Sequence, residues 1–304
     1  MSEYRRLLLL APPEMRRSPA FERAEALALA MGASLYIMAF DFVDTLEVAA
    51  LFDPDAMARA RDGYLELHRR WLRLEADRLR CQGVDVSSNI LWCRHPRRQI
   101  LEYIHDLKID LLIKDVHLES GLKRLFVTPL DWQLLRDCPV PVHLVAAGLN
   151  PLPRHVVVAV DVRGDAAAET LNDTLVRTGQ GMARQCGAIL SLVHVHDKAR
   201  SYVHEMGWGT LPMADGLEMA SRADALQAFR ELANRHSIEK NQRHFLSGTV
   251  LETINTFVSQ SEGDVIVLGT RHAGVLEHIL GSTAENILYR SASSILAVSP
   301  GYAG

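Results

Sequence analysis

Residues 264–286 have the sequence DVIVLGTRHAGVLEHILGSTAEN, and this stretch decides the fold. The apolar run 264–268 is typical of a buried parallel strand, and residues 282–290 are predicted to form a helix. A glycine-containing loop between a strand and a helix N-terminus is a common phosphate-binding arrangement, because backbone N–H groups can approach the oxygens. The alternative is a plain loop in which Gly281 and Ser282 only cap the helix. The stretch has neither a Walker motif nor the Rossmann fingerprint.

The composition indicates a globular protein of about two domains. The chain has 304 residues, an apolar content of 48% and a formal net charge of −4, so it has no overall basic field for nucleic acid or anionic lipid. Four scattered cysteines lack metal-site spacing and fit a reducing compartment. The N-terminus does not resemble a signal peptide, and no stretch reaches the roughly 18 apolar residues of a membrane span. We expect a soluble, cytoplasmic protein that binds neither nucleic acid nor membranes.

Strand and helix patterns alternate along the chain, and the whole series occurs twice. In the first half, apolar runs predict strands at residues 5–11, 34–39, 84–91, 110–114 and 140–145. After a linker rich in Gly and Pro, the second half predicts strands at residues 155–160, 188–195, 243–246, 264–268 and 295–298. Strands that alternate with helices predict a parallel sheet with helices on both faces. We therefore expect an α/β protein with two tandem, doubly wound, five-stranded parallel-sheet domains, residues 1–147 and 148–304.

The two halves align without gaps near their ends. Asp110 and Asp264 are 154 residues apart, and the same offset pairs Thr128 with Ser282. Such an internal repeat predicts a duplicated domain. We expect the halves to superpose and to pack about a pseudo-two-fold axis as an intramolecular pseudo-dimer, and a homodimer of whole chains remains open.

The first copy has lost the glycine loop. At this offset, Asp115, Ser120 and Val127 stand where the second copy has Gly269, Gly274 and Gly281. Carboxylates at Asp115 and Glu119 would repel a phosphate, and valine adopts a left-handed backbone conformation only at a cost. If a nucleotide binds, we expect it in the second copy.

The long helix predicted for residues 54–80 carries an apolar stripe. Its members follow steps of three and four residues: Met57, Ala60, Tyr64, Leu67, Trp71 and Leu74. Such a stripe predicts the face of the helix that packs on the core.

Four polar residues near the end of the predicted strand 188–195 could bind a metal: His194, His196, Asp197 and His204. Two histidines at i and i+2 of a strand share one face, which suits a metal. The interpretation that we favour is that they are polar residues at the exposed carboxyl end of the strand. Nucleophilic catalysis has little support, because Ser282 has no base that the sequence reveals.

These features together resemble the universal stress proteins, and in particular the tandem E-type members of bacteria. The resemblance covers essentially the whole chain. It rests on the repeated five-stranded pattern and on three segments, residues 126–139, 268–270 and 280–288.

The resemblance implies an adenine-nucleotide site in the second domain. The residues expected to bind the nucleotide are Asp161, Val162, Val193, Gly269, Thr270, Arg271, Gly274, Gly281, Ser282 and Thr283. Asp161 and Val162 match the family's site at the first strand, Val193 matches its adenine wall, and the others match the phosphate loop. The loop departs from the family pattern, since His272 replaces the second glycine and Gly281 comes one residue early; Gly274 could take over that role. The first copy has Pro12 where the aspartate is expected.

The function implied is a stress-response protein that binds ATP or a related nucleotide, with or without Mg²⁺, in its second domain and without strong catalysis. Weak ATP hydrolysis remains open, although no general base stands out. One alternative is a nucleotide-free scaffold for protein partners that the sequence does not identify. The other is a first domain that binds an apolar small molecule.

Overall fold

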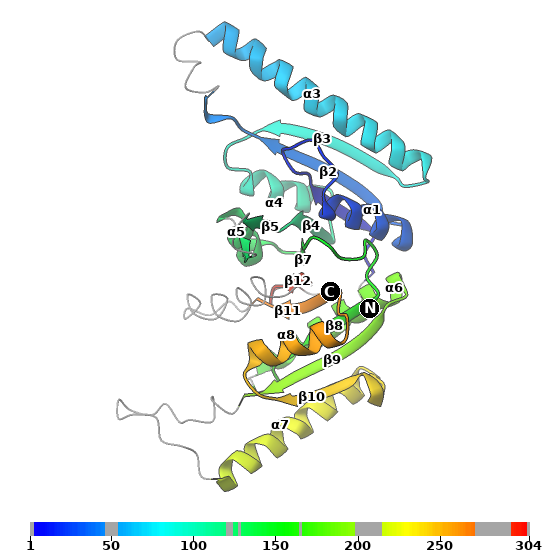
Figure 1. Cartoon of the computed structure of the whole chain (residues 1–304), viewed down its shortest axis with the longest axis vertical. Helices are drawn as coiled ribbons and strands as arrows, with labels where there is room; N and C mark the ends of the chain where they lie inside the picture. The colour runs from blue at the N-terminus through cyan, green and yellow to red at the C-terminus, as the bar shows by residue number, and fades with distance from the viewer. Residues whose placement is uncertain are drawn as a thin grey trace, which may run out of the picture. The chain divides into compact units, whose positions relative to one another are not determined.

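The fold consists of two α/β units, each built on parallel strands and helices (Figure 1). The computed structural model describes residues 3–45, 54–119, 124–126, 129–163, 166–197, 215–270 and 293–302. The first unit comprises residues 4–116 and 140–152, and the second comprises residues 1–3, 117–139 and 153–304.

The first unit contains five parallel strands in the order β3-β2-β1-β4-β7. The strands are β1 (Arg6–Leu10), β2 (Ser34–Asp41), β3 (Val86–Trp92), β4 (Leu111–Asp115) and β7 (Val142–Val145). The helices are α1 (Pro19–Met31), α3 (Pro54–Cys81) and α4 (Arg97–Asp106). Leu7, Leu8 and Leu9 of β1 are fully buried, as expected for a central parallel strand that is covered on both faces.

The second unit repeats this order as β10-β9-β8-β11-β12. The strands are β8 (His155–Ala159), β9 (Ile189–His196), β10 (Arg243–Ser247), β11 (Val265–Gly269) and β12 (Ser294–Val298). The helices are α6 (Ala166–Cys186), α7 (Asp215–Arg235) and α8 (Val250–Gln260), with a 3₁₀ turn at Lys240–Gln242. The predicted pair of five-stranded parallel-sheet domains is confirmed.

One hairpin was not predicted. It consists of β5 (His117–Glu119) and β6 (Arg124–Phe126), which pair antiparallel, and α5 (Pro129–Asp137) follows it. Strands of three residues are too short for an alternating apolar pattern to show in the sequence.

The duplication is visible in two matching carboxylates. Asp110 accepts hydrogen bonds from the backbone N–H groups of Arg5 and Arg6, at 2.8 and 3.1 Å. Asp264 accepts bonds from the N–H groups of Arg154 and His155, at 2.7 and 3.1 Å. Each carboxylate therefore ties the start of one central strand to the start of the neighbouring strand. This offset of 154 residues at the fourth strand of each unit is the one that the sequence showed.

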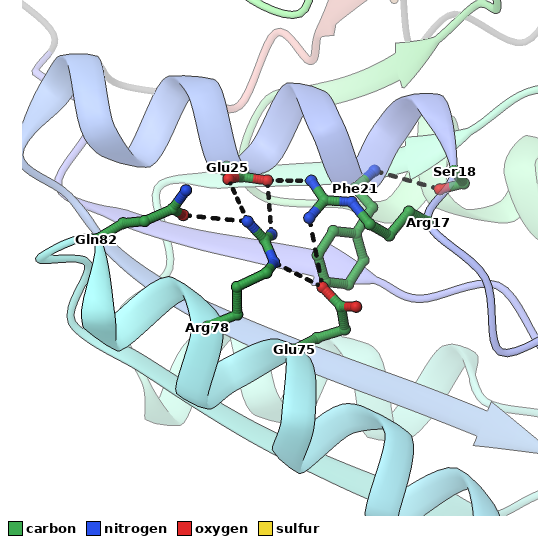
Figure 2. A network of polar contacts seen from close by, with 7 residues as sticks. All are labelled: Arg17, Ser18, Phe21, Glu25, Glu75, Arg78 and Gln82. Atoms are coloured by element: carbon green, nitrogen blue, oxygen red, sulfur yellow. Dashed lines mark hydrogen bonds and ion pairs between the residues drawn. The ribbon is translucent and has the colours of Figure 1, made fainter.

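Helices α1 and α3 of the first unit are joined by an ion-pair network (Figure 2). Glu25 of α1 accepts two hydrogen bonds from Arg78 of α3, at 2.9 and 2.8 Å, and also contacts Arg17. Arg78 and Arg17 contact Glu75 as well, at 3.1 and 3.4 Å. The hydrogen bonds from Arg78 outweigh burial and, with those from Arg17, lower the pKa of Glu25 to about 2. The network fixes the packing of α3 on α1.

The predicted core face of α3 is wrong by about one residue. Leu67 and Leu74 are 59% and 61% exposed, and Ala60 is exposed too. The buried residues of α3 are His68, Leu72, Ala76 and Leu79. Because α3 carries two adjacent apolar stripes, its spacing alone did not show which one packs on the sheet. None of the helices in the described ranges is long and apolar enough to cross a membrane.

Candidate functional site

The strand order of the second unit reverses at β8, and we call the region outside the carboxyl ends of β8 and β11 the crevice. The chain leaves β8 toward β9 on one side, whereas β11 flanks β8 on the other. In open parallel sheets, ligands bind outside the carboxyl ends of the strands at such a point. Two segments border it here, Val160–Asp161 after β8 and Gly269–Thr270 at the end of β11.

Asp161 presents a carboxylate at this crevice. Its side chain is 53% exposed, and its Oδ1 accepts the backbone N–H of Arg163 at 3.1 Å, with the Arg163 Nε at 3.4 Å. Partial burial favours the neutral acid, but the bond from the Arg163 amide and the charge of its guanidinium lower the pKa of Asp161 overall. The group is therefore an ionised acceptor, suited to hydroxyl or amino donors. This role of Arg163 was not predicted from the sequence.

Two buried side chains hold the backbone that carries Asp161. Asn172 of α6 donates from Nδ2 to the carbonyl of Asp161 at 2.8 Å, and Nδ1 of His194 lies 3.0 Å from the carbonyl of Val160. Because a carbonyl only accepts, this contact assigns the proton of the neutral imidazole to Nδ1. Asn172 and His194 are 6% and 1% exposed. The crevice edge is thus fixed by a helix and a neighbouring strand, neither of which motif spacing indicated.

Strand β9 carries Val193, the residue predicted for the apolar wall of the site. Val193, the predicted wall residue, is 1% exposed, and its carbonyl accepts the N–H of Val160 at 2.9 Å. Ala159 pairs with Val193 in the sheet, so continuing this register places Val195 level with Asp161. Val195 is therefore one step closer to the crevice than Val193. Val162, which was also predicted, is half-buried in the loop after β8.

His194 and His196 are not exposed polar residues, and that interpretation is wrong. They are 1% and 0% exposed, and both rings pack on Phe245, with centroids 5.2 and 6.2 Å away. Burial lowers the pKa of His194. β9 extends beyond the end of β8, so its last residues are covered by aromatic side chains from α7 and β10. Within the described ranges no group of three or more His, Cys, Asp or Glu could hold a metal, and the predicted ligand His204 lies outside them.

Gly269 and Thr270 have structural roles at the end of β11. A Cβ on Gly269 would lie 2.7 Å from Cδ2 of Leu171, so α6 packs too closely for a side chain there. Thr270 is 3% exposed, and its N–H and hydroxyl both point to the carbonyl of Val298, at 2.8 and 3.4 Å. Neither donor of Thr270 is therefore turned toward the crevice. The other predicted phosphate-loop residues lie outside the described ranges: Arg271, His272, Gly274, Gly281, Ser282 and Thr283.

The first unit has a different arrangement at the equivalent place. The N–H of Ala11 bonds the carbonyl of Met38 as Val160 bonds Val193, so Pro12 occupies the position of Asp161. Asp115, the counterpart of Gly269, accepts the N–H of Ala20 in the first turn of α1 at 2.8 Å. A carboxylate thus occupies the helix N-terminus and leaves it a poor anion site.

Helix length explains this difference between the units. α6 has 21 residues and α1 has 13, and each ends at a glycine of positive φ, Gly187 or Gly32. The additional residues of α6 therefore lie at its N-terminal end, where Leu171 covers Gly269. α1 lacks these turns, so its first N–H groups are within reach of Asp115.

Known proteins match the chain over nearly its full length. The model of the Universal stress protein family matches residues 3–146 and 153–299. Universal stress protein E of Photorhabdus laumondii is 27% identical over 99% of this chain and 96% of its own length, and that of Escherichia coli K12 is 25% identical over 99% and 95%. A universal stress protein structure from Archaeoglobus fulgidus aligns with a TM-score of 0.67 at 19% identity, over 97% of this chain and 98% of that one. The structure of a protein from Pseudomonas aeruginosa PAO1 aligns with a TM-score of 0.73 at 21% identity, over 98% of this chain and 93% of that one. These two structures share the fold.

Proposed function

The chain belongs to the universal stress protein family as a tandem, E-type member, and from this premise we propose that its second domain binds ATP or a related adenine nucleotide. The observation that carries the proposal is the ionised, half-exposed carboxylate of Asp161 at the point where the strand order reverses. The hydrogen bonds from Asn172 and His194 to the backbone on either side hold it in place before a ligand arrives.

In this proposal each part of the crevice binds one part of the nucleotide. Asp161 accepts hydrogen bonds from ribose hydroxyls or from the base amino group, because an ionised carboxylate only accepts. Val193 and Val195 provide an apolar wall for the flat base. Arg163 adds a positive charge at the same end of the sheet. The phosphates bind along the loop that begins after Thr270, where Arg271, Gly274, Gly281, Ser282 and Thr283 follow.

The first domain should not bind the nucleotide in the same way. Pro12 has no carboxylate for a ribose, and Asp115 already occupies the N-terminus of α1. The proposal is therefore one nucleotide per chain. An apolar ligand of the first domain stays a prediction, and no catalytic residue is proposed.

Isothermal titration with ATP, in the presence and absence of Mg²⁺, tests the proposal. We expect a stoichiometry near one for the wild type and about tenfold to hundredfold weaker binding for Asp161→Asn, the loss of one or two bonds to a charged group. Asp224→Asn, an exposed carboxylate change on α7, is the matched control and should leave binding unchanged. Gly281→Val copies Val127 of the first domain and should abolish binding.

Two outcomes would contradict the proposal. If the wild type binds no adenine nucleotide even at millimolar concentration, the proposal is wrong and the nucleotide-free scaffold becomes the favoured interpretation. A stoichiometry near two would mean that Pro12 and Asp115 do not prevent binding in the first domain.

Asn172→Leu tests whether the position of Asp161 matters as well as its contact with the nucleotide. The change should weaken binding although Asn172 reaches only the backbone of Asp161.

A further inference from the structure

The outward face of α3 carries two leucines, Leu67 and Leu74, in a stripe that the fold leaves in solvent. We call it the α3 outer stripe; its residues are Gly63, Leu67, Arg70, Leu74, Asp77 and Cys81, all exposed. They follow alternating steps of four and three residues, the spacing of a helix–helix seam. Leu67 and Leu74 are among the exposed large hydrophobic residues, at 59% and 61%. In Figure 1, α3 lies along the β3 side of the first sheet.

The fold itself does not need leucines on this stripe. The core side of α3 is complete without them, because Leu72, Ala76 and Leu79 are buried against the sheet. Helix α7 has the same place in the second unit, and its buried Ala225, Phe229 and Leu232 match those three positions. In this alignment of the two helices, Ala220 and Gln227 of α7 correspond to Leu67 and Leu74 of α3. The duplicated domain thus folds with small or polar residues where α3 exposes leucine.

We propose that the α3 outer stripe pairs antiparallel with the same stripe of a second copy of this chain. The charges of α3 favour this partner and this direction. Residues 54–66 contain three acidic and two basic side chains, whereas residues 67–81 contain five basic and two acidic ones. An antiparallel pair sets the acidic half of each helix against the basic half of the other, and a parallel pair sets like halves together.

The contacts follow from a two-fold axis near residue 72. Leu67 of one copy then lies level with Asp77 of the other and within one helical turn of Leu74, and Leu74 lies level with Arg70. Arg70 comes within reach of Asp77 across the seam. Gly63 faces Cys81 of the second copy. A Cβ on Gly63 would meet no atom within 4 Å in the monomer, so packing within the monomer does not require glycine at this position. The glycine leaves room for a second helix to approach closely.

The interface should be weak because it is small. A helix of 28 residues is about 42 Å long, and a seam about 10 Å wide covers roughly 400 Å² per copy. Stable dimers commonly bury about 800 Å² per partner. We therefore expect a dimer that dissociates in the micromolar range and depends on concentration.

Sedimentation of the full-length protein over a range of concentrations tests the association. The wild type should shift from monomer to dimer as its concentration rises, and the double variant Leu67→Glu, Leu74→Glu should dissociate about a hundredfold more readily or stay monomeric. Leu29→Glu changes a leucine of α1 that is 46% exposed and should leave association unchanged. A wild type that stays monomeric at all concentrations, or a Leu29→Glu effect as large, would overturn the proposal.

Disulfide trapping tests the direction of pairing. Gly63→Cys should form an intermolecular disulfide with the native Cys81 under mild oxidation, because the antiparallel pair brings these positions together. The wild type, in which the two Cys81 residues lie at opposite ends of the seam, should cross-link far less. Efficient cross-linking of the wild type through Cys81 alone would mean a parallel pair, and no cross-link in either protein would rule out the seam.

Discussion

Replacing Glu25 by glutamine should loosen the packing of α1 on α3 at neutral pH and have a smaller effect in acid. Glu25 lies at the centre of the network in Figure 2, where Arg17 and Arg78 both contact its carboxylate. Its side chain is 13% exposed. Glutamine keeps the size and one acceptor oxygen but removes the charge, so the change isolates the charged part of the interaction.

The pKa of Glu25 sets the size of the stabilisation by its ionised carboxylate and the pH range over which this stabilisation is lost. A fall from 4.5 to about 2 corresponds to at most roughly 3 kcal/mol. Because Arg17 and Arg78 are 30% and 35% exposed, screening by water reduces the expected contribution to about 1–2 kcal/mol. The folded pKa lies below the unfolded one, so this stability is present above pH 4.5 and is lost as the pH falls toward 2. About two-fifths of it should remain near pH 3.

The assay is hydrogen exchange of the folded protein, read from the peptides that cover α1 and α3, since these report on the first unit alone. At pH 7, Glu25→Gln should lower the free energy of opening of both helices by about 1–2 kcal/mol, and near pH 3 by less than half of that. Glu102→Gln on α4 removes an exposed ion pair with Arg98 and should change neither helix. An equal loss at pH 7 and pH 3 would refute the electrostatic argument and leave only a packing effect.

Two further changes test the second unit. Gly269→Ala should cost about 1–3 kcal/mol in unfolding free energy because the new methyl meets Leu171, and Leu171→Ala in the same chain should recover part of it; a neutral single change would contradict the close packing. Asp264→Ala should cost about 2–4 kcal/mol because it leaves the N–H groups of Arg154 and His155 unpaired, whereas Asp264→Asn keeps an acceptor oxygen. Urea unfolding measures both, and equal losses for Ala and Asn would contradict this account.

Most of the fold could be predicted from the sequence because it rests on local patterns. Short apolar runs predicted every strand of the two parallel series. The failures occurred where a local pattern allows two answers. Spacing along α3 fits two adjacent faces, and only the contacts with the sheet decide that Leu72 is buried and Leu74 is not.

The candidate site was less predictable, since it depends on residues that are distant in sequence. Asp161 could be located from its place after the first strand of the second repeat. Asn172 and His194 could not, because their role depends on α6 and β9 converging on one turn of backbone. The burial of His194 and His196 also depends on residues distant in sequence. β9 extends beyond β8, and this extension buries the two histidines that were predicted to be exposed. Val195 was missed because only the sheet register shows which residue is level with Asp161.

The two repeats differ at the start of the first helix of each unit. In the second unit, the longer α6 brings Leu171 over the end of β11, so a side chain at position 269 would have to displace Leu171 whether or not a phosphate binds nearby. In the first unit, α1 starts later and exposes an N–H that Asp115 bonds. Gly269 is explained by its contact with α6, and Asp115 by its hydrogen bond to α1. The glycine alone is therefore weak evidence for a nucleotide. The stronger evidence is Asp161, because Pro12 at the equivalent position shows that the fold does not require a carboxylate there.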